Sequence, residues 1–175
     1  MSDNGRISIL FLLNLLLYFL AGELNFYLAH WAVHLHLDAL LIVFFGLYVS
    51  RTSSLLYTAL LGGLAGAMNP LAGGTYIIGY VCLWMYFVWC QRRIRRQNSI
   101  HVRAATAVGQ LLWMLVLVLF DGTYQWGSTA YWGRFLTELL LSTVVIYLLA
   151  WPWCRFQKKF LYTLGWDLEA LPPPH

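Results

Sequence analysis

The residues best suited to chemistry lie in one short stretch, AHWAVHLHLD, near the end of the first apolar run. His30 and His34 stand four positions apart, His36 follows two positions later, and Glu23 and Asp38 flank the group. Imidazole and carboxylate groups both bind zinc, but a zinc site needs three or four ligands that converge on one point. We expect this stretch to turn between two helices, which would spread the side chains. The favoured interpretation is therefore histidines at the membrane surface, and no metal site is predicted.

An acidic side chain, Glu138, stands inside the last apolar run, with Ser142 four residues later. An ionisable group at membrane depth is by default a candidate functional residue. Glu138 is only about one helical turn from the outer end of its run, so we expect its carboxylate to reach water. Asp38 and Asp121 lie similarly close to predicted outer boundaries.

Motifs typical of catalysis are missing from the sequence. It contains no GxSxG, no HExxH and no glycine-rich phosphate loop. Cys82, Cys90 and Cys154 form no CxxC pair, and we interpret them as small packing residues. We therefore predict a protein that is not an enzyme and holds no cofactor.

The composition is that of a membrane protein. Hydrophobic residues make up 61% of the 175 residues and charged residues only 10%. A soluble domain is about 45–50% apolar and about 25% charged. The net charge of +4 does not indicate nucleic-acid binding, because the basic residues separate apolar runs and do not line a polar face.

Six apolar runs are candidates for membrane-spanning helices, which need about 20 residues each. We predict an all-α polytopic bundle over residues 1–155, followed by an amphipathic and proline-rich cytoplasmic tail at 156–175, where Phe156, Phe160 and Leu164 recur at every fourth position. The second and third runs are short, so a broken or re-entrant third segment stays open. The predicted spans are 7–28, 35–50, 54–69, 74–91, 104–121 and 135–154.

The distribution of positive charge predicts the orientation. With the N-terminus inside, all of the 11 lysines and arginines except Arg134 fall on the inner side. Cytoplasmic loops carry such an excess, so both termini are predicted in the cytoplasm. One inner loop concentrates this charge; it would also attract anionic lipid, or contact an acidic partner. Its basic residues are Arg92, Arg93, Arg95, Arg96 and Arg103.

Small residues along the third run form one continuous face, against which another helix can pack closely. A groove for a ligand or partner is the alternative. A turn then ends the run, so the third and fourth runs are predicted to form a close antiparallel hairpin. On the first run, a polar stripe that includes Asn14, Tyr18 and Asn25 should face protein. The hairpin residues are Ala59, Gly62, Gly63, Gly66, Ala67, Asn69, Pro70 and Gly73.

The stretch LLGGLAGAMNPLAGGTYIIGYVCLWMYFVWCQRRIRR, and the close WPWCRFQKKF, resemble the MreD family of bacterial rod-shape-determining membrane proteins. The resemblance covers about residues 35–160 in length, span order and topology. Asn69 and Ile77 stand where the family pattern has an aspartate and a second turn glycine.

This resemblance implies a scaffold subunit of the cell-wall elongation machinery in the bacterial inner membrane. Its partners would be MreC, RodA with a penicillin-binding protein, and indirectly MreB. The implied fold is similar to the substrate-binding subunits of energy-coupling-factor transporters. The alternative function is therefore a solute-binding subunit of a vitamin or metal transporter, with His34, His36 and Trp126 closing over a small molecule. The first run lacks the alanine-x-x-x-alanine contact of such subunits.

Overall fold

The structure, a computed structural model, describes residues 3–49, 51–68, 73–94, 97–121 and 127–165 of the chain. Within these ranges every regular element is a helix, which confirms the predicted all-α class. The described elements, in chain order, are α1 (Asp3–Leu28), the 3-10 helix η1 (Ala29–Trp31), α2 (Asp38–Tyr48), α3 (Arg51–Met68), α4 (Gly73–Gln91), α5 (Ser99–Asp121) and α6 (Thr129–Thr163).

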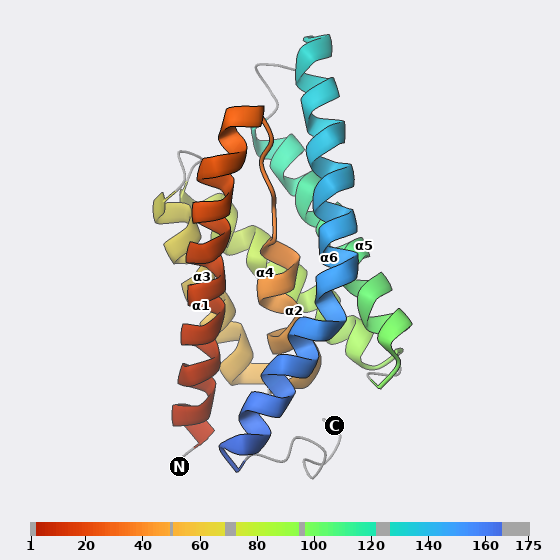
Figure 1. Ribbon diagram of the computed structural model, residues 1–175. Helices are drawn as coiled ribbons and strands as arrows, with labels where there is room; N and C mark the ends of the chain where they lie inside the picture. The colour runs from red at the N-terminus through yellow and green to blue at the C-terminus, as the bar shows by residue number, and fades with distance from the viewer. Residues whose placement is uncertain (1–2, 50, 69–72, 95–96, 122–126, 166–175) are drawn as a thin grey trace.

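The helices form one bundle in which the chain alternates in direction (Figure 1). α1 rises from the lower end of the view, and η1 turns the chain at the upper end. The chain then descends through α2, rises through α3, descends through α4, rises through α5 and descends through α6 (Figure 1). The start of α1 and the end of α6 therefore share the lower end.

Three of the described helices are long and apolar enough to cross a membrane. They occupy Ile7–Trp31, Ser99–Phe120 and Thr129–Thr163. A hydrocarbon core about 30 Å thick needs roughly 20 apolar residues of helix. The membrane class predicted from composition is thus supported by helices of the required length.

The second predicted span, 35–50, is not a continuous helix. α2 has 11 residues, all of them buried, and its length of about 16 Å is far below the thickness of the hydrocarbon core. Residues 33–37 belong to no helix and descend as an extended segment to the start of α2 (Figure 1). The sequence VHLHL explains this difference, because alternation of apolar and polar residues favours extended backbone. The break therefore falls in the second predicted span, and the third is a helix.

α5 begins earlier than predicted, and α6 extends beyond its predicted span at both ends. α5 begins at Ser99, where the Asn98 side chain accepts a hydrogen bond from the Ile100 amide at 2.9 Å and caps the helix. α6 continues to Thr163, so its last turns include residues predicted to start a separate tail. α6 bends in its lower half (Figure 1), in agreement with Pro152 inside the helix, which cannot donate a backbone hydrogen bond.

The last turns of α6 pack against the bundle. Gln157 is fully buried and its amide donates a hydrogen bond to the Asn14 side chain of α1 at 3.0 Å. The Lys158 ammonium lies 4.3 Å from the centre of the Tyr48 ring at the end of α2. α1 and α6 therefore meet at the lower end, and farther up the extended segment lies between them (Figure 1).

Glycines allow the helices of the core to approach closely. A Cβ on Gly62 of α3 would stand 2.9 Å from the Ile77 Cα of α4. The same atom on Gly46 of α2 would overlap the Phe87 side chain of α4, and on Gly79 of α4 it would overlap the Trp113 ring of α5. α4 thus packs closely against α2, α3 and α5, and each of these contacts depends on a missing side chain.

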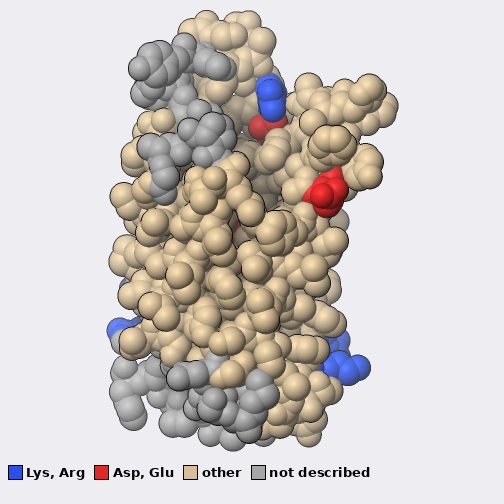
Figure 2. Space-filling view, turned by 90° about the vertical axis from the view of Figure 1, so that its left-hand side faces the viewer, with Lys and Arg blue, Asp and Glu red and all other residues tan. Residues whose placement is uncertain are grey.

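Charged residues concentrate toward the two ends of the bundle. On the face shown in Figure 2, the middle carries no charged residue, the acidic residues lie in the upper part, and most basic residues lie near the lower end. One basic residue lies in the upper part, directly beside an acidic one (Figure 2). An uncharged middle belt of this kind is what the hydrocarbon core of a bilayer requires.

Candidate functional site

Two side chains of α6 hold the extended segment through its backbone. The His34 amide donates to Glu138 Oε1 at 3.1 Å, and the His36 amide donates to Ser142 Oγ at 3.0 Å. Four residues of helix rise about 6 Å, and two residues of extended chain rise about 6.6 Å. The spacing of Glu138 and Ser142 therefore matches the spacing of the His34 and His36 amides, which lie on the same side of the extended segment.

The opposite side of the segment is held by α1. Asn25 Oδ1 accepts the Leu35 amide at 2.7 Å, and Asn25 Nδ2 donates to the Leu35 carbonyl at 2.8 Å. One amide side chain thus satisfies both backbone groups of a buried residue. Below this point, the Ala39 amide donates to Gln110 Oε1 of α5 at 3.4 Å. Backbone outside a helix is tolerated at membrane depth only where protein satisfies its polar groups, as these side chains do.

Glu138 does not reach out to water as the sequence analysis expected. The residue is buried, with 8% of its surface exposed. Its Oε1 accepts a hydrogen bond from Arg134 Nε at 2.9 Å, and its Oε2 lies 3.9 Å from His36 Nε2. A buried carboxylate requires partners of this kind. The expectation was wrong because the extended segment, which the sequence analysis took for helix, covers the acid.

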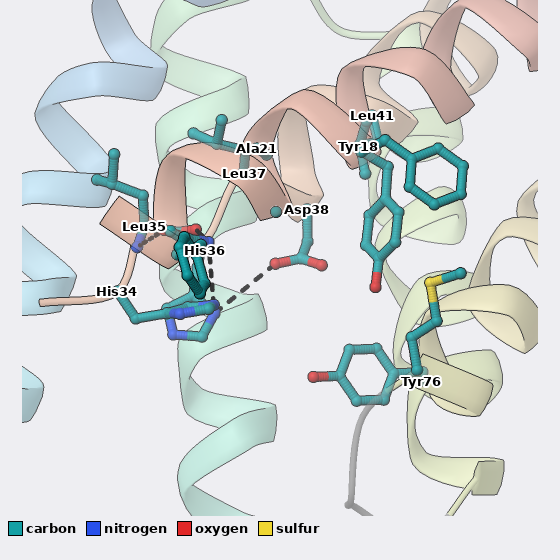
Figure 3. A pocket seen from close by; sticks show the side chains of 14 residues that line it. Tyr18, Ala21, His34, Leu35, His36, Leu37, Asp38, Leu41 and Tyr76 are labelled. Carbon is teal, nitrogen blue, oxygen red and sulfur yellow. Dashed lines mark hydrogen bonds and ion pairs between the residues drawn. The ribbon is translucent and has the colours of Figure 1, made fainter. Parts of the chain in front are cut away.

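Beside the extended segment lies a cavity of about 430 Å³. Its walls come from α1, the extended segment, the first turn of α2, the end of α3 and the start of α4. The lining combines aromatic rings with polar groups, and Figure 3 shows the Tyr18 hydroxyl to the right of the Asp38 carboxylate and the Tyr76 hydroxyl below it. The lining residues are Tyr18, Phe19, Ala21, Gly22, Asn25, Phe26, His34, Leu35, His36, Leu37, Asp38, Leu41, Met68 and Tyr76.

Asp38 is the buried acid of this cavity. It is 8% exposed and accepts a hydrogen bond from the hydroxyl of Tyr80, which is itself fully buried. Its other oxygen lies 3.9 Å from His36 Nδ1. The His34 and His36 rings lie beside each other, with centroids 4.7 Å apart. From the sequence we expected Asp38 near a water boundary; in the structure it is buried at the start of α2, bonded to Tyr80 of α4 and facing the cavity.

The structure separates the five residues first considered as metal ligands. His30 and Glu23 are exposed, and the His30 ring contacts Trp31. Three of the five, His34, His36 and Asp38, line the cavity. Among the residues that the structure describes, no group of three or more histidines, cysteines or acids has the arrangement of a metal site.

The residues of the predicted small-residue face differ in their surroundings. Gly62 and Gly66 are buried, Ala59 and Gly63 are half-buried, and Ala67 is exposed. Gly63 has only the tip of Ile77 near it, at 3.9 Å from an added Cβ. Gly73 begins α4. The predicted turn residues Asn69 and Pro70 lie outside the described residues.

The predicted basic loop is described in part. Arg92 and Arg93 are exposed, and the Arg93 guanidinium lies 4.1 Å from the centre of the Trp89 ring. Arg103 is half-buried within α5, with its guanidinium 5.8 Å from the Tyr147 ring centre. Arg95 and Arg96 lie outside the described ranges, as do Trp126 and residues 166–175 of the predicted tail.

Sequence reasoning identified most polar residues of this site but not their relationship. Asn25, Gln110, Glu138 and Ser142 were each recognisable as polar groups in apolar runs. All four bond to the backbone of residues 34–39. This could not be predicted, because that segment was interpreted as turn and helix. The alternating VHLHL pattern was the signal that could have revealed it.

No protein-family model, no curated protein and no solved structure matches the chain. Any function for this protein is therefore argued from the geometry above and from the resemblance of its hairpin and closing segments.

Proposed function

We propose that this protein is a non-enzymatic membrane scaffold of the MreD type, which docks MreC and the peptidoglycan synthase pair in the cell-wall elongation complex. In this proposal the chain crosses the bacterial inner membrane six times, with both termini in the cytoplasm. The second crossing consists of the extended segment followed by α2. Supporting this, the start of α1 and the end of α6 share the end near which most basic residues lie.

One observation carries the proposal: four polar side chains inside the bundle bond to its own backbone. Asn25, Gln110, Glu138 and Ser142 all bond to the segment 34–39. Such bonds fix a shape, because each would leave a buried amide unsatisfied if it were broken. A fixed frame with apolar outer faces suits a subunit whose task is to position other membrane proteins.

The surface offered to a single-pass partner is formed by α1 and α6. Leu12 and Leu16 of α1 and Leu140, Val144 and Leu148 of α6 recur every four residues and are each more than half exposed. Helices associate in lipid through close packing and not through the hydrophobic effect, so leucine stripes accept either lipid or a partner helix. The resemblance to MreD favours the helix of MreC as the partner.

The proposal is tested by photo-crosslinking in native membranes. A photoreactive amino acid replaces Leu140, which is 65% exposed, and in a control replaces Ile146, which is fully buried on the same helix. We expect a crosslink to an MreC-type protein from position 140 and only internal crosslinks from position 146. Purification of the protein with a stoichiometric vitamin and without any elongation protein would contradict the scaffold.

The second candidate function is a solute-binding subunit of an energy-coupling-factor type transporter. It is favoured by the cavity beside the extended segment, whose volume of about 430 Å³ is in the range for small-molecule sites. In the predicted orientation this cavity lies toward the outer side. Here a co-purifying ATPase cassette is the expected result, and its absence together with a bound MreC-type protein would favour the scaffold.

A further inference from the structure

We propose that the cavity beside the extended segment binds a small organic cation, with its ammonium group at Asp38 and its apolar body between aromatic walls. The inference goes beyond the proposed function, because a scaffold and a transporter subunit could each hold such a ligand. It depends on the charge of the cavity, the direction of its polar groups and the character of its walls.

The two carboxylates near the cavity differ in their basic partners. Glu138 has a full partner in Arg134, whose Nε lies 2.9 Å from it. Among the described residues, the only basic group within ion-pair distance of Asp38 is His36, at 3.9 Å. The carboxylate that faces the cavity is therefore the one without a lysine or arginine partner among the described residues. A buried carboxylate favours the approach of a cation that can donate hydrogen bonds.

The neighbours of Asp38 leave room for such a donor. Tyr80, which is not one of the lining residues, donates to one carboxylate oxygen. The second oxygen is beyond hydrogen-bond distance of His36, at 3.9 Å. In Figure 3 the carboxylate points into the space between Tyr18 and Tyr76. An ammonium group has three donors, and it could bond this oxygen while it lies close to both tyrosine side chains.

The walls suit an apolar or aromatic body. Tyr18, Phe19 and Phe26 of α1, Met68 of α3 and Tyr76 of α4 all line the cavity. Aromatic faces attract cations, and methionine adapts its shape to a flat ligand. Tyr76 is held in place by Trp113, with ring centroids 5.3 Å apart. An arylalkyl amine combines the required charge with a body of this kind.

Binding of tryptamine tests the proposal, measured by isothermal titration calorimetry on the full-length protein in nanodiscs. The matched probes are tryptophol, which replaces the amine by a hydroxyl, and indole-3-acetate, which replaces it by a carboxylate. We expect tryptamine to bind, tryptophol to bind at least about 30-fold more weakly, and indole-3-acetate not to bind, because removing one partner of a buried charged contact commonly has this effect.

Two variants and one control identify the site. Asp38→Asn keeps an oxygen for the Tyr80 hydroxyl and removes the charge, so we expect affinity for tryptamine to fall at least about 30-fold. Gly22→Leu places a side chain at a cavity wall where an added Cβ meets nothing within 4 Å, so it should fill the cavity and abolish binding without disturbing the fold. Glu23→Gln is the control: it removes an exposed acid next to Gly22 in the sequence and should leave the affinity for tryptamine unchanged.

The titrations decide whether the cavity binds the cation and whether the ammonium group comes from a solute or a lipid. Equal binding of tryptamine and tryptophol, or unchanged affinity in both Asp38→Asn and Gly22→Leu, would overturn the proposal. A lipid headgroup could supply the same ammonium chemistry, so the titration is repeated with phosphatidylethanolamine in the nanodisc. Competition by this lipid would assign the ammonium to a headgroup, and no competition would assign it to a free solute. A failure of crosslinking to an MreC-type protein would bear on the scaffold and not on this site.

Discussion

At the scale of single residues, the structure depends on side chains that take the place of backbone groups as hydrogen-bond partners of the main chain. Asn25 exchanges two hydrogen bonds with Leu35, as a neighbouring strand would do. Glu138 and Ser142 accept hydrogen bonds from the His34 and His36 amides on the other side of the extended segment. Polar residues in a membrane bundle are commonly interpreted as parts of a transport path or a catalytic site. Here their geometry assigns them first to the main chain, and of these three only Asn25 also lines the cavity.

Replacement of Asn25 should reveal this role. Asn25→Leu leaves the amide and the carbonyl of Leu35 without partners in a buried place, and the expected loss of stability is about 2–4 kcal/mol. Thermal unfolding in detergent measures it, with a thiol-reactive dye that reports exposure of the buried Cys90 and Cys154. Asn98→Ala removes an exposed helix cap and should cost about 1 kcal/mol or less. Equal unfolding temperatures for the two variants would contradict the assignment.

At the scale of elements, the central helix of the bundle is the shortest of the described α-helices. α2 is buried along its entire length, and it is surrounded by longer helices. A helix of 11 residues is too short to span the hydrocarbon core of a bilayer by itself. Burial in protein removes that requirement, because its ends are never exposed to lipid. The close contacts of α4 then fix the positions of α2, α3 and α5.

Two adjacent glycines of α3 provide a matched test of these contacts. Gly62→Ala pushes a methyl group against the backbone of α4, and flexible side chains cannot relieve that overlap. We expect a loss of about 1–3 kcal/mol from overpacking. Gly63→Ala meets ordinary van der Waals distance and should be neutral or stabilising by up to about 1 kcal/mol. Unfolding temperatures of the two variants in detergent measure the difference, and the same loss in both would exclude a specific contact at Gly62.

At the scale of the whole molecule, sequence reasoning predicts the composition class and most helices. Length and hydropathy are sufficient for α1, α3, α4, α5 and α6, because each is a single apolar run. They fail for residues 33–37, because this extended segment depends on partners more than 100 residues away, Glu138 and Ser142. The cavity could not be predicted for the same reason: its walls come from four different helices.

The proposed orientation gives a prediction for the intact cell. A cysteine introduced by Asn98→Cys, between α4 and α5, should resist a membrane-impermeant thiol reagent, because this position lies among the inner basic residues. Ser128→Cys, at the start of α6, should react. Both substitutions are made together with Cys82→Ala, because Cys82 is the exposed cysteine of the described chain. Reaction at position 98 in unbroken cells would reverse the orientation.

The support of residues 33–37 by distant side chains has a consequence for biogenesis. The ribosome delivers this segment to the translocon before Glu138 and Ser142 have been synthesised. Until they arrive, only Asn25 can replace water on its amides, so the segment cannot settle stably among lipid tails. The second passage through the bundle is therefore completed late, when the final helix inserts and closes over a part of the chain made long before it.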